Sequence, residues 1–329
     1  MDSVSQAVLG ASVAGVFAPA GHRRKALLAG AVLGTVPDLD VFIDFGGPVE
    51  NFTFHRGFSH SLFILAPFSL VLWLALRRWW APVSKDPGPW LAAISLALLT
   101  HPMLDAHTAY GTQLFWPLEV TPAMWGTLFI IDPLYTLPLV IGVIAASIWP
   151  VGPRAIRVLR VGLMLSTLYI GWSWIAKLTV EANVSDALAR EGMQDAPVFI
   201  TPTPFNTLLW RAVVMTEEGY LEGFDSLVVN ERELEFSHYL SDVETLDETG
   251  QLWAVQRLRW FADGFVRAEV IDRRLLISDL RMGQEPGYVF NFFVAEYGNP
   301  HWKTTAVEQI PLAMADRALT ETWRRIWAE

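Results

Sequence analysis

Long apolar stretches dominate the first 180 residues of the chain. A helix needs about 20 apolar residues to cross the hydrocarbon core of a bilayer. Six stretches approach or reach this length, at about residues 4–20, 26–45, 60–76, 89–106, 127–149 and 159–178. The pattern predicts a mainly α-helical, multi-pass membrane bundle of five to six transmembrane helices over residues 1–180.

After residue 181 the apolar runs become shorter and turn residues separate them. Segments rich in aromatic and β-branched residues predict strands, and apolar residues near helical spacing predict helices. The expected strands are 208–216, 219–229, 265–282 and 288–297; the expected helices are 242–262 and 312–327, and 201–206 is an expected linker or turn. Residues 181–329 are therefore expected to form a soluble α+β domain with an antiparallel sheet.

Composition agrees with this division. The 329 residues are 52% hydrophobic and only 18% charged, whereas soluble domains average about 25% charged residues. The first 180 residues are slightly basic, and the remainder is acidic, which gives a net charge of −10. This charge argues against nucleic acid as a partner. The absence of Cys excludes disulfides and Cys-based metal sites, so any metal must be held by His and carboxylates.

Basic residues set the expected orientation. Clusters at 23–25, 77–78 and 154–160 lie in alternate predicted loops, and cytoplasmic loops are enriched in Lys and Arg. The prediction places the N-terminus, the 46–59 and 107–126 loops and the C-terminal domain outside the cytoplasm.

Ionisable and polar residues inside this apolar region gather near one side of the predicted membrane. They are Gln6, Asp38, Asp40, His55, His60, His101, Asp105 and Asp132. Such residues are costly in a membrane and need a partner or a function. Three His and several Asp from separate segments favour a catalytic or metal site, while the alternative is a set of buried hydrogen-bonded pairs, with Arg56 neutralising an Asp.

Local spacing supports metal binding. His101 and Asp105 are four residues apart and share one face of a helix. Asp38 and Asp40 would diverge on a regular helix, but Pro37 can break the helix and an extended turn would then direct both carboxylates inward.

The segment around Gly57 predicts a turn that brings His55 and His60 together. Ser59 is the expected N-cap of a helix that starts at His60. Arg56 in this turn is suited to binding a phosphate or carboxylate group.

The motifs at 36–40 (VPDLD), 55–62 (HRGFSHSL), 101–112 (HPMLDAHTAYGT) and 131–135 (IDPLY) carry a resemblance to a known family. The chain resembles the predicted metal-dependent hydrolases of bacterial inner membranes, which include LexA-regulated membrane-bound proteins, above all through the His-Arg-Gly-x-Ser/Thr-His-Ser block. The resemblance implies a hydrolase of the inner membrane. The metal-site residues that it implies are Asp38, His55, His60, His101 and Asp105, with Asp40 close to them; many members have His where this chain has Gln6.

The chemistry of these residues suits one or two divalent ions, with Zn²⁺ favoured and Mn²⁺ as the alternative. A bound metal lowers the pKa of its water to about 7. We expect Asp40 to orient or deprotonate that water and Arg56 to bind an anionic substrate, so that phosphoesters or lipid-like, amphipathic molecules are hydrolysed at the outer membrane face. Membrane lipids are the expected partners. The competing hypothesis is a non-catalytic membrane scaffold or lipid-binding protein with a structural metal or polar cluster.

Overall fold

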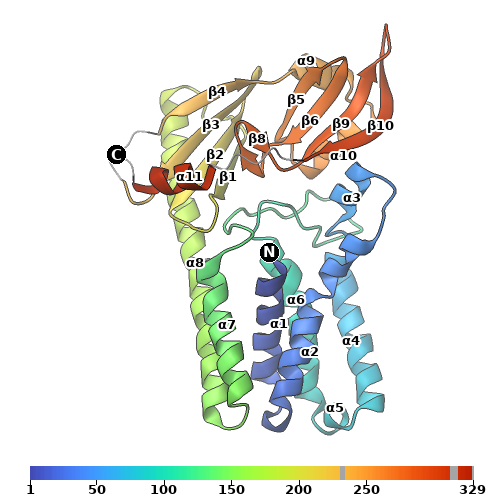
Figure 1. The fold of residues 1–329 in the computed structure, drawn as a ribbon, viewed down its shortest axis with the longest axis vertical. Helices are drawn as coiled ribbons and strands as arrows, with labels where there is room; N and C mark the ends of the chain where they lie inside the picture. Colours follow the sequence, from blue (N-terminus) through green and yellow to red (C-terminus); the bar gives the residue numbers. More distant parts are fainter. Residues whose placement is uncertain (230–233, 312–317, 328–329) are drawn as a thin grey trace. The chain divides into compact units, whose positions relative to one another are not determined.

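The computed structural model describes residues 1–229, 234–311 and 318–327. The described residues divide into two compact units (Figure 1). The helical unit contains Met1–Ile43, His55–Trp125 and Ile130–Ser173; the α+β unit contains Asp44–Phe54, Gly126–Phe129 and the residues from Trp174 onward. The boundary expected near residue 180 lies inside the helix α8 (Pro153–Arg190), which begins in the first unit and ends in the second.

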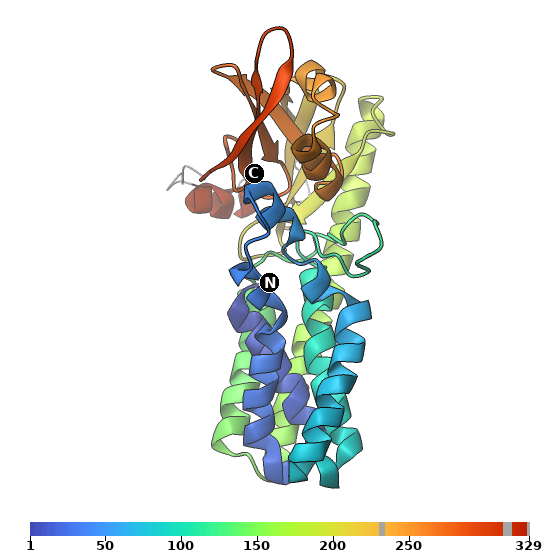
Figure 2. The ribbon, with the colours of Figure 1, turned by 90° about the vertical axis from the view of Figure 1, so that its right-hand side faces the viewer.

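The helical unit is a bundle of helices that lie alongside one another (Figure 2), and two of them begin at clear capping residues. Its elements are α1 (Ser3–Phe17), η1 (Ala20–His22), α2 (Arg23–Thr35), η2 (Pro37–Phe42), η3 (Phe58–His60), α4 (Leu62–Trp79), α5 (Ala81–Lys85), α6 (Pro87–Asp105), α7 (Pro133–Ile148) and the first part of α8. Asp2 caps α1 by accepting hydrogen bonds from Val4 and Ser5. Asp132 caps α7 in the same way, just before Pro133.

Glycines allow α1 and α2 to approach each other closely. A Cβ atom added to Gly30 would lie 2.3 Å from the carbonyl oxygen of Gly10, and one added to Gly34 would lie 2.5 Å from the carbonyl oxygen of Gln6. These distances leave no room for a side chain. Gly30 and Gly34 are small residues four positions apart in the sequence, a spacing that predicts close helix packing. The structure confirms this prediction, and Gly10 supplies the facing surface.

The prediction of five to six transmembrane helices is wrong. In the described chain, two helices are long and apolar enough to cross a membrane, α4 and α8. The apolar stretches at 4–20, 26–45 and 127–149 contain helices of only 15, 13 and 16 residues, about 20–24 Å long at 1.5 Å per residue, because loops and 3₁₀ turns occupy the rest. The fourth stretch forms α6, which has 19 residues but is not among the helices apolar enough to cross a membrane.

The α+β unit contains the expected C-terminal sheet structure. Its elements are α3 (Pro48–Phe54), the last part of α8, β1 (Val198–Pro202), β2 (Leu209–Met215), β3 (Gly219–Ser226), β4 (Phe236–Leu240), α9 (Val243–Glu248), α10 (Trp253–Phe261), β5 (Val266–Ile271), β6 (Arg274–Asp279), β7 (Gly283–Gln284), β8 (Gly287–Tyr288), β9 (Asn291–Tyr297), β10 (Trp302–Ile310) and α11 (Ala318–Trp327). In the described residues the strands form antiparallel sheets with the orders β1-β2-β3-β4, β10-β9-β6-β5 and β7-β8.

Several predicted elements differ in detail. The single strand expected at 265–282 is the hairpin of β5 and β6, because Asp272 and Arg273 both have positive φ and form its turn. The helix expected at 242–262 is two helices, α9 and α10. The linker expected at 201–206 begins inside β1. Of the helix expected at 312–327, residues 312–317 lie outside the described residues.

Each four-stranded sheet packs against helices of its own unit. Ala176, Val180, Val184 and Leu188 of α8 form a buried core with residues of β1, β2 and β3. At the second sheet, the ring of Phe52 on α3 lies 5.4 Å from the ring of Phe292 on β9 and 4.9 Å from the ring of Phe261 on α10. Helix α8, which is apolar enough to be a candidate transmembrane helix, therefore also supplies part of the core of the α+β unit.

The α1–α2 contact gives a first testable prediction. Replacing Gly30 with Val places side-chain atoms against the backbone of α1, and we expect this to reduce the stability of the folded state by about 1–3 kcal/mol. Thermal unfolding in detergent measures the effect. Gly171→Ala on α8 is the matched control, because a Cβ at Gly171 meets no described atom within 4 Å. Equal melting temperatures for the two variants would contradict the prediction.

Candidate metal centre

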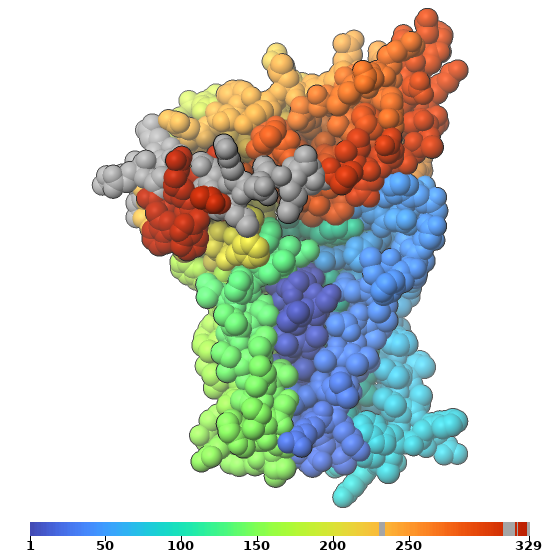
Figure 3. Space-filling model, in the orientation of Figure 1, coloured from blue at the N-terminus to red at the C-terminus, as the bar shows by residue number. Residues whose placement is uncertain are grey.

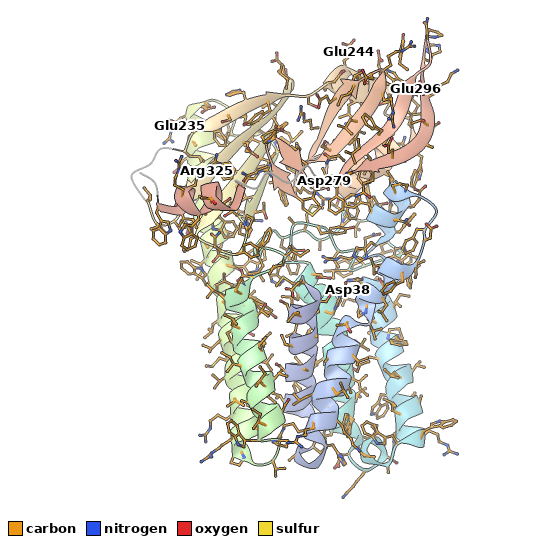
Figure 4. All side chains as sticks on the ribbon, in the orientation of Figure 1. Asp38, Glu235, Glu244, Asp279, Glu296 and Arg325 are labelled. Atoms are coloured by element: carbon orange, nitrogen blue, oxygen red, sulfur yellow. The ribbon has the colours of Figure 1, made fainter. Side chains whose placement is uncertain are left out.

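Four of the predicted metal-site residues meet at one end of the helical unit. Asp38 comes from η2, His60 from η3, and His101 and Asp105 from the last turns of α6. One ligand atom from each lies within 4.8 Å of the other three. His60, His101 and Asp105 are fully buried, whereas the side chain of Asp38 is 21% exposed; Figure 4 labels it near the end of α2. This group could hold a metal ion.

The hydrogen bonds around the two imidazoles direct a lone pair of each toward the centre of the group. Nδ1 of His101 lies 2.6 Å from the carbonyl oxygen of Gly34, which only accepts, so this nitrogen donates. Ser59 donates its hydroxyl proton to Asp40 and therefore accepts from Nδ1 of His60 at 2.9 Å. In both neutral rings Nε2 is then the unprotonated nitrogen. Metal-binding His residues are held in this way by partners outside the metal site.

The distances between the ligand atoms fit a tetrahedral ion. The Nε2 atoms of His60 and His101 lie 3.0 Å apart. Each is 3.4 Å from Oδ1 of Asp38, and they are 3.1 and 3.4 Å from Oδ2 of Asp105. Ligands at the 2.0–2.1 Å typical of zinc would be separated by about 3.3–3.4 Å in a regular tetrahedron. Five of the six distances between the donor atoms are thus close to those between the ligands of a small tetrahedral cation, and the sixth, between the two carboxylate oxygens, is at most 4.8 Å.

One oxygen of the buried Asp105 carboxylate is left without a hydrogen bond. Its Oδ2 atom has no hydrogen-bond partner among the described residues, and a buried polar atom without such a partner is unfavourable. Oδ1 accepts a hydrogen bond from the amide of Gln6 at 3.0 Å and contacts the amino group of Met1. Gln6 therefore positions a ligand in this structure. Oδ2 faces the two imidazoles, where a metal ion would satisfy it.

Arg56 is buried beside this group. Its Nε atom lies 3.4 Å from Oδ2 of Asp105, its Nη1 donates to Thr108 at 3.3 Å, and its guanidinium lies 4.9 Å from the ring centre of Tyr110. Only 3% of Arg56 is exposed. The residue predicted to bind substrate thus contacts a predicted ligand and balances part of its charge.

Asp40 and His55 form a second pair next to the four-residue group. Asp40 accepts hydrogen bonds from Ser59, from the backbone N–H of Arg56 at 3.0 Å and from Nδ1 of His55 at 2.8 Å. Burial raises the pKa of Asp40, but the hydrogen bond and charge of His55, together with the hydrogen bond of Ser59, outweigh burial and hold this pKa below its ordinary value. Asp40 is therefore ionised at neutral pH and orients the His55 ring.

The structure separates residues that the sequence analysis grouped. His55, predicted as a metal ligand, lies outside the four-residue group, with its ring 6.0 Å from that of His60. The expected extended turn at 37–40 is instead a 3₁₀ helix, whose three residues per turn send Asp38 and Asp40 in different directions. Asp132 caps α7 and accepts a hydrogen bond from Tyr169.

The expected N-cap at Ser59 is also wrong. Helix α4 starts at Leu62, and Ser61 is its cap. Ser59 instead connects His60 to Asp40. The carbonyl of Gly34 is a further functional group that the sequence analysis missed, because a backbone carbonyl leaves no signal in the residue types.

Comparison with known proteins assigns the family. The model of the YdjM inner membrane protein family matches residues 1–180, more than half of the chain and all segments that form the metal centre. The chain belongs to the YdjM inner membrane protein family. It is thus a protein of the bacterial inner membrane, as predicted.

Two curated relatives are similar over parts of their length. The uncharacterized protein YfhP of Bacillus subtilis (strain 168) is 24% identical over 235 residues, 68% of each chain. The inner membrane protein YbcI of Escherichia coli (strain K12) is 35% identical over 94 residues, 28% of this chain and 52% of YbcI. The chain thus covers about half the length of YbcI. No solved structure matches the chain.

Metal content tests the centre in this YdjM-family protein. We expect the purified protein to retain about one equivalent of zinc per chain, and His60→Ala and Asp105→Asn to lose it, since each removes a ligand from a four-ligand site. His55→Ala should retain the metal, because His55 lies outside the group. Elemental mass spectrometry on folded, monodisperse samples measures this. Loss of metal from His55→Ala equal to that from His60→Ala would contradict the arrangement.

Proposed function

We propose that this YdjM-family protein is a metal-dependent hydrolase. The observation that carries the proposal is the Asp40–His55 pair beside the four-residue group. A metal site that only stabilises a fold has no use for an oriented imidazole next to it, whereas hydrolysis requires a group that accepts a proton from water or donates one to a leaving group.

The geometry of His55 suits this role. Its Nδ1 is bonded to Asp40 at 2.8 Å, so in the neutral ring Nε2 carries the lone pair. The ring packs edge-on against Tyr110, with centres 5.5 Å apart, and 20% of the side chain is exposed. A buried carboxylate that fixes the tautomer and orientation of an imidazole is the arrangement that general-base catalysis uses. His55 thus takes the proton-transfer role, and Asp40 positions it.

The four-residue group would hold the metal through His60, His101, Asp38 and Asp105. A bound zinc ion would supply a Lewis acid and make water more acidic. Asp38 is the partly exposed member of the group, and the neighbouring His55 is also partly exposed, so substrate would reach the site through these two residues. Arg56 holds Asp105 in place through its charge and its contact with Tyr110.

The surroundings favour an amphipathic phosphoester or lipid-like substrate. Leu39, Val41 and Phe42 of η2 are 54%, 65% and 82% exposed. Leu39 lies between Asp38 and Asp40 in the chain, and the other two directly follow Asp40. Exposed apolar residues at this density are typical of contact with lipid or another apolar ligand. An apolar chain lying on η2 would bring its polar head to Asp38 and His55.

A structural metal site in a membrane scaffold is the second candidate. The observation that favours it is the number of ligands, because four protein groups complete a tetrahedron, and closed sites of this kind are usually structural. The two functions differ in what they require of His55, which a structural site does not need.

Activity of the His55 variant separates the two. With bis(p-nitrophenyl) phosphate and phosphatidylglycerol in mixed micelles as probes, we expect hydrolysis by the metal-loaded protein and a loss of about 10²–10⁴-fold in kcat for His55→Ala at unchanged metal content. Asp40→Asn should also lower kcat, because it removes the charge that orients His55. His301→Ala, an exposed histidine of the α+β unit, is the control. Equal rates in wild type and His55→Ala would overturn the proposed role.

We also propose that the α+β unit lies outside the cytoplasm. Arg77 and Arg78 lie at the end of α4, and Arg154, Arg157 and Arg160 at the start of α8. The positive-inside rule places these ends of the two candidate transmembrane helices in the cytoplasm. The other end of α8, which continues into the α+β unit, is then on the opposite side of the membrane.

Cysteine labelling tests this orientation, because the natural chain has no Cys. A membrane-impermeant maleimide should label Leu240→Cys, at an exposed site on β4, in intact cells from which the outer membrane has been removed. Ser84→Cys on α5, next to Arg77 and Arg78 in the chain, should react only after the cells are lysed. The reverse pattern would place the α+β unit in the cytoplasm.

A further inference from the structure

Helix α11 lies at the surface of the α+β unit (Figure 3). Its inner side is fixed to the first sheet of that unit. Ile326 is fully buried, and its carbonyl oxygen accepts a hydrogen bond from Ser226 at the end of β3, at 2.9 Å. The guanidinium of Arg325, labelled in Figure 4, lies 4.4 Å from the ring centre of Phe224. α11 therefore has a defined side that faces outward.

Two tryptophans occupy the outward side. Trp323 and Trp327 are 63% and 53% exposed. They are four residues apart and thus neighbours on the helix surface, with ring centres 6.1 Å apart. A soluble domain seldom leaves two adjacent indole rings in water, so such a pair marks an interaction surface.

The charge of α11 indicates what covers these rings. The chain as a whole has a net charge of −10, whereas α11 contains Arg324 and Arg325 against one acidic residue, Glu321. Because Arg325 packs on Phe224, Arg324 is the cation beside the exposed tryptophans. Trp is enriched at the boundary between lipid and water. Helices with aromatic residues and Arg on their accessible side bind anionic lipid surfaces. An acidic protein surface would attract the arginines too, but it has no equivalent preference for paired indoles.

The α+β unit also follows directly on a candidate transmembrane helix. α8 continues without a break from its apolar part into the core of the α+β unit. At 38 residues it is about 57 Å long, whereas the bilayer core is only about 30 Å thick. The helix thus has enough residues to cross the bilayer core and still contribute to the core of the α+β unit.

We propose that α11 is a membrane-docking helix, in which Trp323 and Trp327 insert into the interfacial region of an anionic bilayer and Arg324 lies among the lipid headgroups. The docking gives the α+β unit a second attachment to the membrane besides α8. This inference does not depend on the proposed hydrolase activity.

The test uses the full-length protein, which has no native Cys. A single NBD fluorophore is attached at Trp323→Cys, and the protein is placed in lipid nanodiscs of phosphatidylcholine and phosphatidylglycerol, in which both membrane faces are open to solution. We expect doxyl-labelled lipid to quench the fluorophore and iodide to quench it several-fold less than at Leu240→Cys, an exposed control on β4. Trp327→Cys is an independent second site on the same side of α11.

The composition of the nanodisc gives a further readout. Quenching by doxyl lipid at residue 323 should decrease when phosphatidylglycerol is omitted and when Arg324 is replaced with Glu, because the headgroup attraction is lost. Strong iodide quenching at both tryptophan positions would overturn the proposal. Protection from iodide without quenching by doxyl lipid, or protection that appears only with two proteins per disc, would show that a protein surface covers α11 and would also overturn it.

Discussion

Two imidazole nitrogens 3.0 Å apart, both turned toward two carboxylates, are the constraint around which the helical unit is organised. Lone pairs at this distance repel each other unless a positive charge lies among them. Partners outside the group fix the tautomer of each imidazole. The carbonyl of Gly34 and the hydroxyl of Ser59 determine which nitrogen of each ring carries the proton. The group is therefore prepared for a cation by contacts that lie outside it.

These outside contacts depend on helix packing. Gly34 belongs to the surface at which α1 and α2 approach without side chains between them, and the same approach brings Gln6 to Asp105. The backbone of α2 at Gly34 thus both packs against α1 and orients His101 through its carbonyl oxygen. Next to the group, Asp40 connects it to a second pair by accepting from both Ser59 and His55. The centre and the Asp40–His55 pair share one hydrogen-bond network, so a change at Ser59 affects both.

The sequence was informative where spacing alone determines geometry. The i, i+4 relation of His101 and Asp105 on one helix placed them together, and the glycines of α2 indicated a close helix contact. It was misleading where the local backbone conformation determines the length of a helix or the direction of a side chain. Apolar stretches did not reveal that α2 ends at Thr35, so the number of transmembrane helices was overestimated. Residue types likewise did not distinguish a 3₁₀ helix from an extended turn at 37–40, and this difference sends Asp40 to His55. The hairpin at Asp272 and Arg273 was missed because neither residue is a glycine.

The continuity of α8 has a consequence for biogenesis. Residues 176–188 of this helix form one side of the core beneath β1, β2 and β3, and these strands follow α8 in the chain. During synthesis the helix leaves the ribosome before the strands that cover it, and domains fold in the order in which they emerge. The first sheet can bury its apolar face only against a helix that has already been made, and that helix is one of the two candidate transmembrane helices. Insertion of α8 into a membrane would therefore precede completion of the α+β core, and a failure of that step would leave the apolar face of the first sheet exposed.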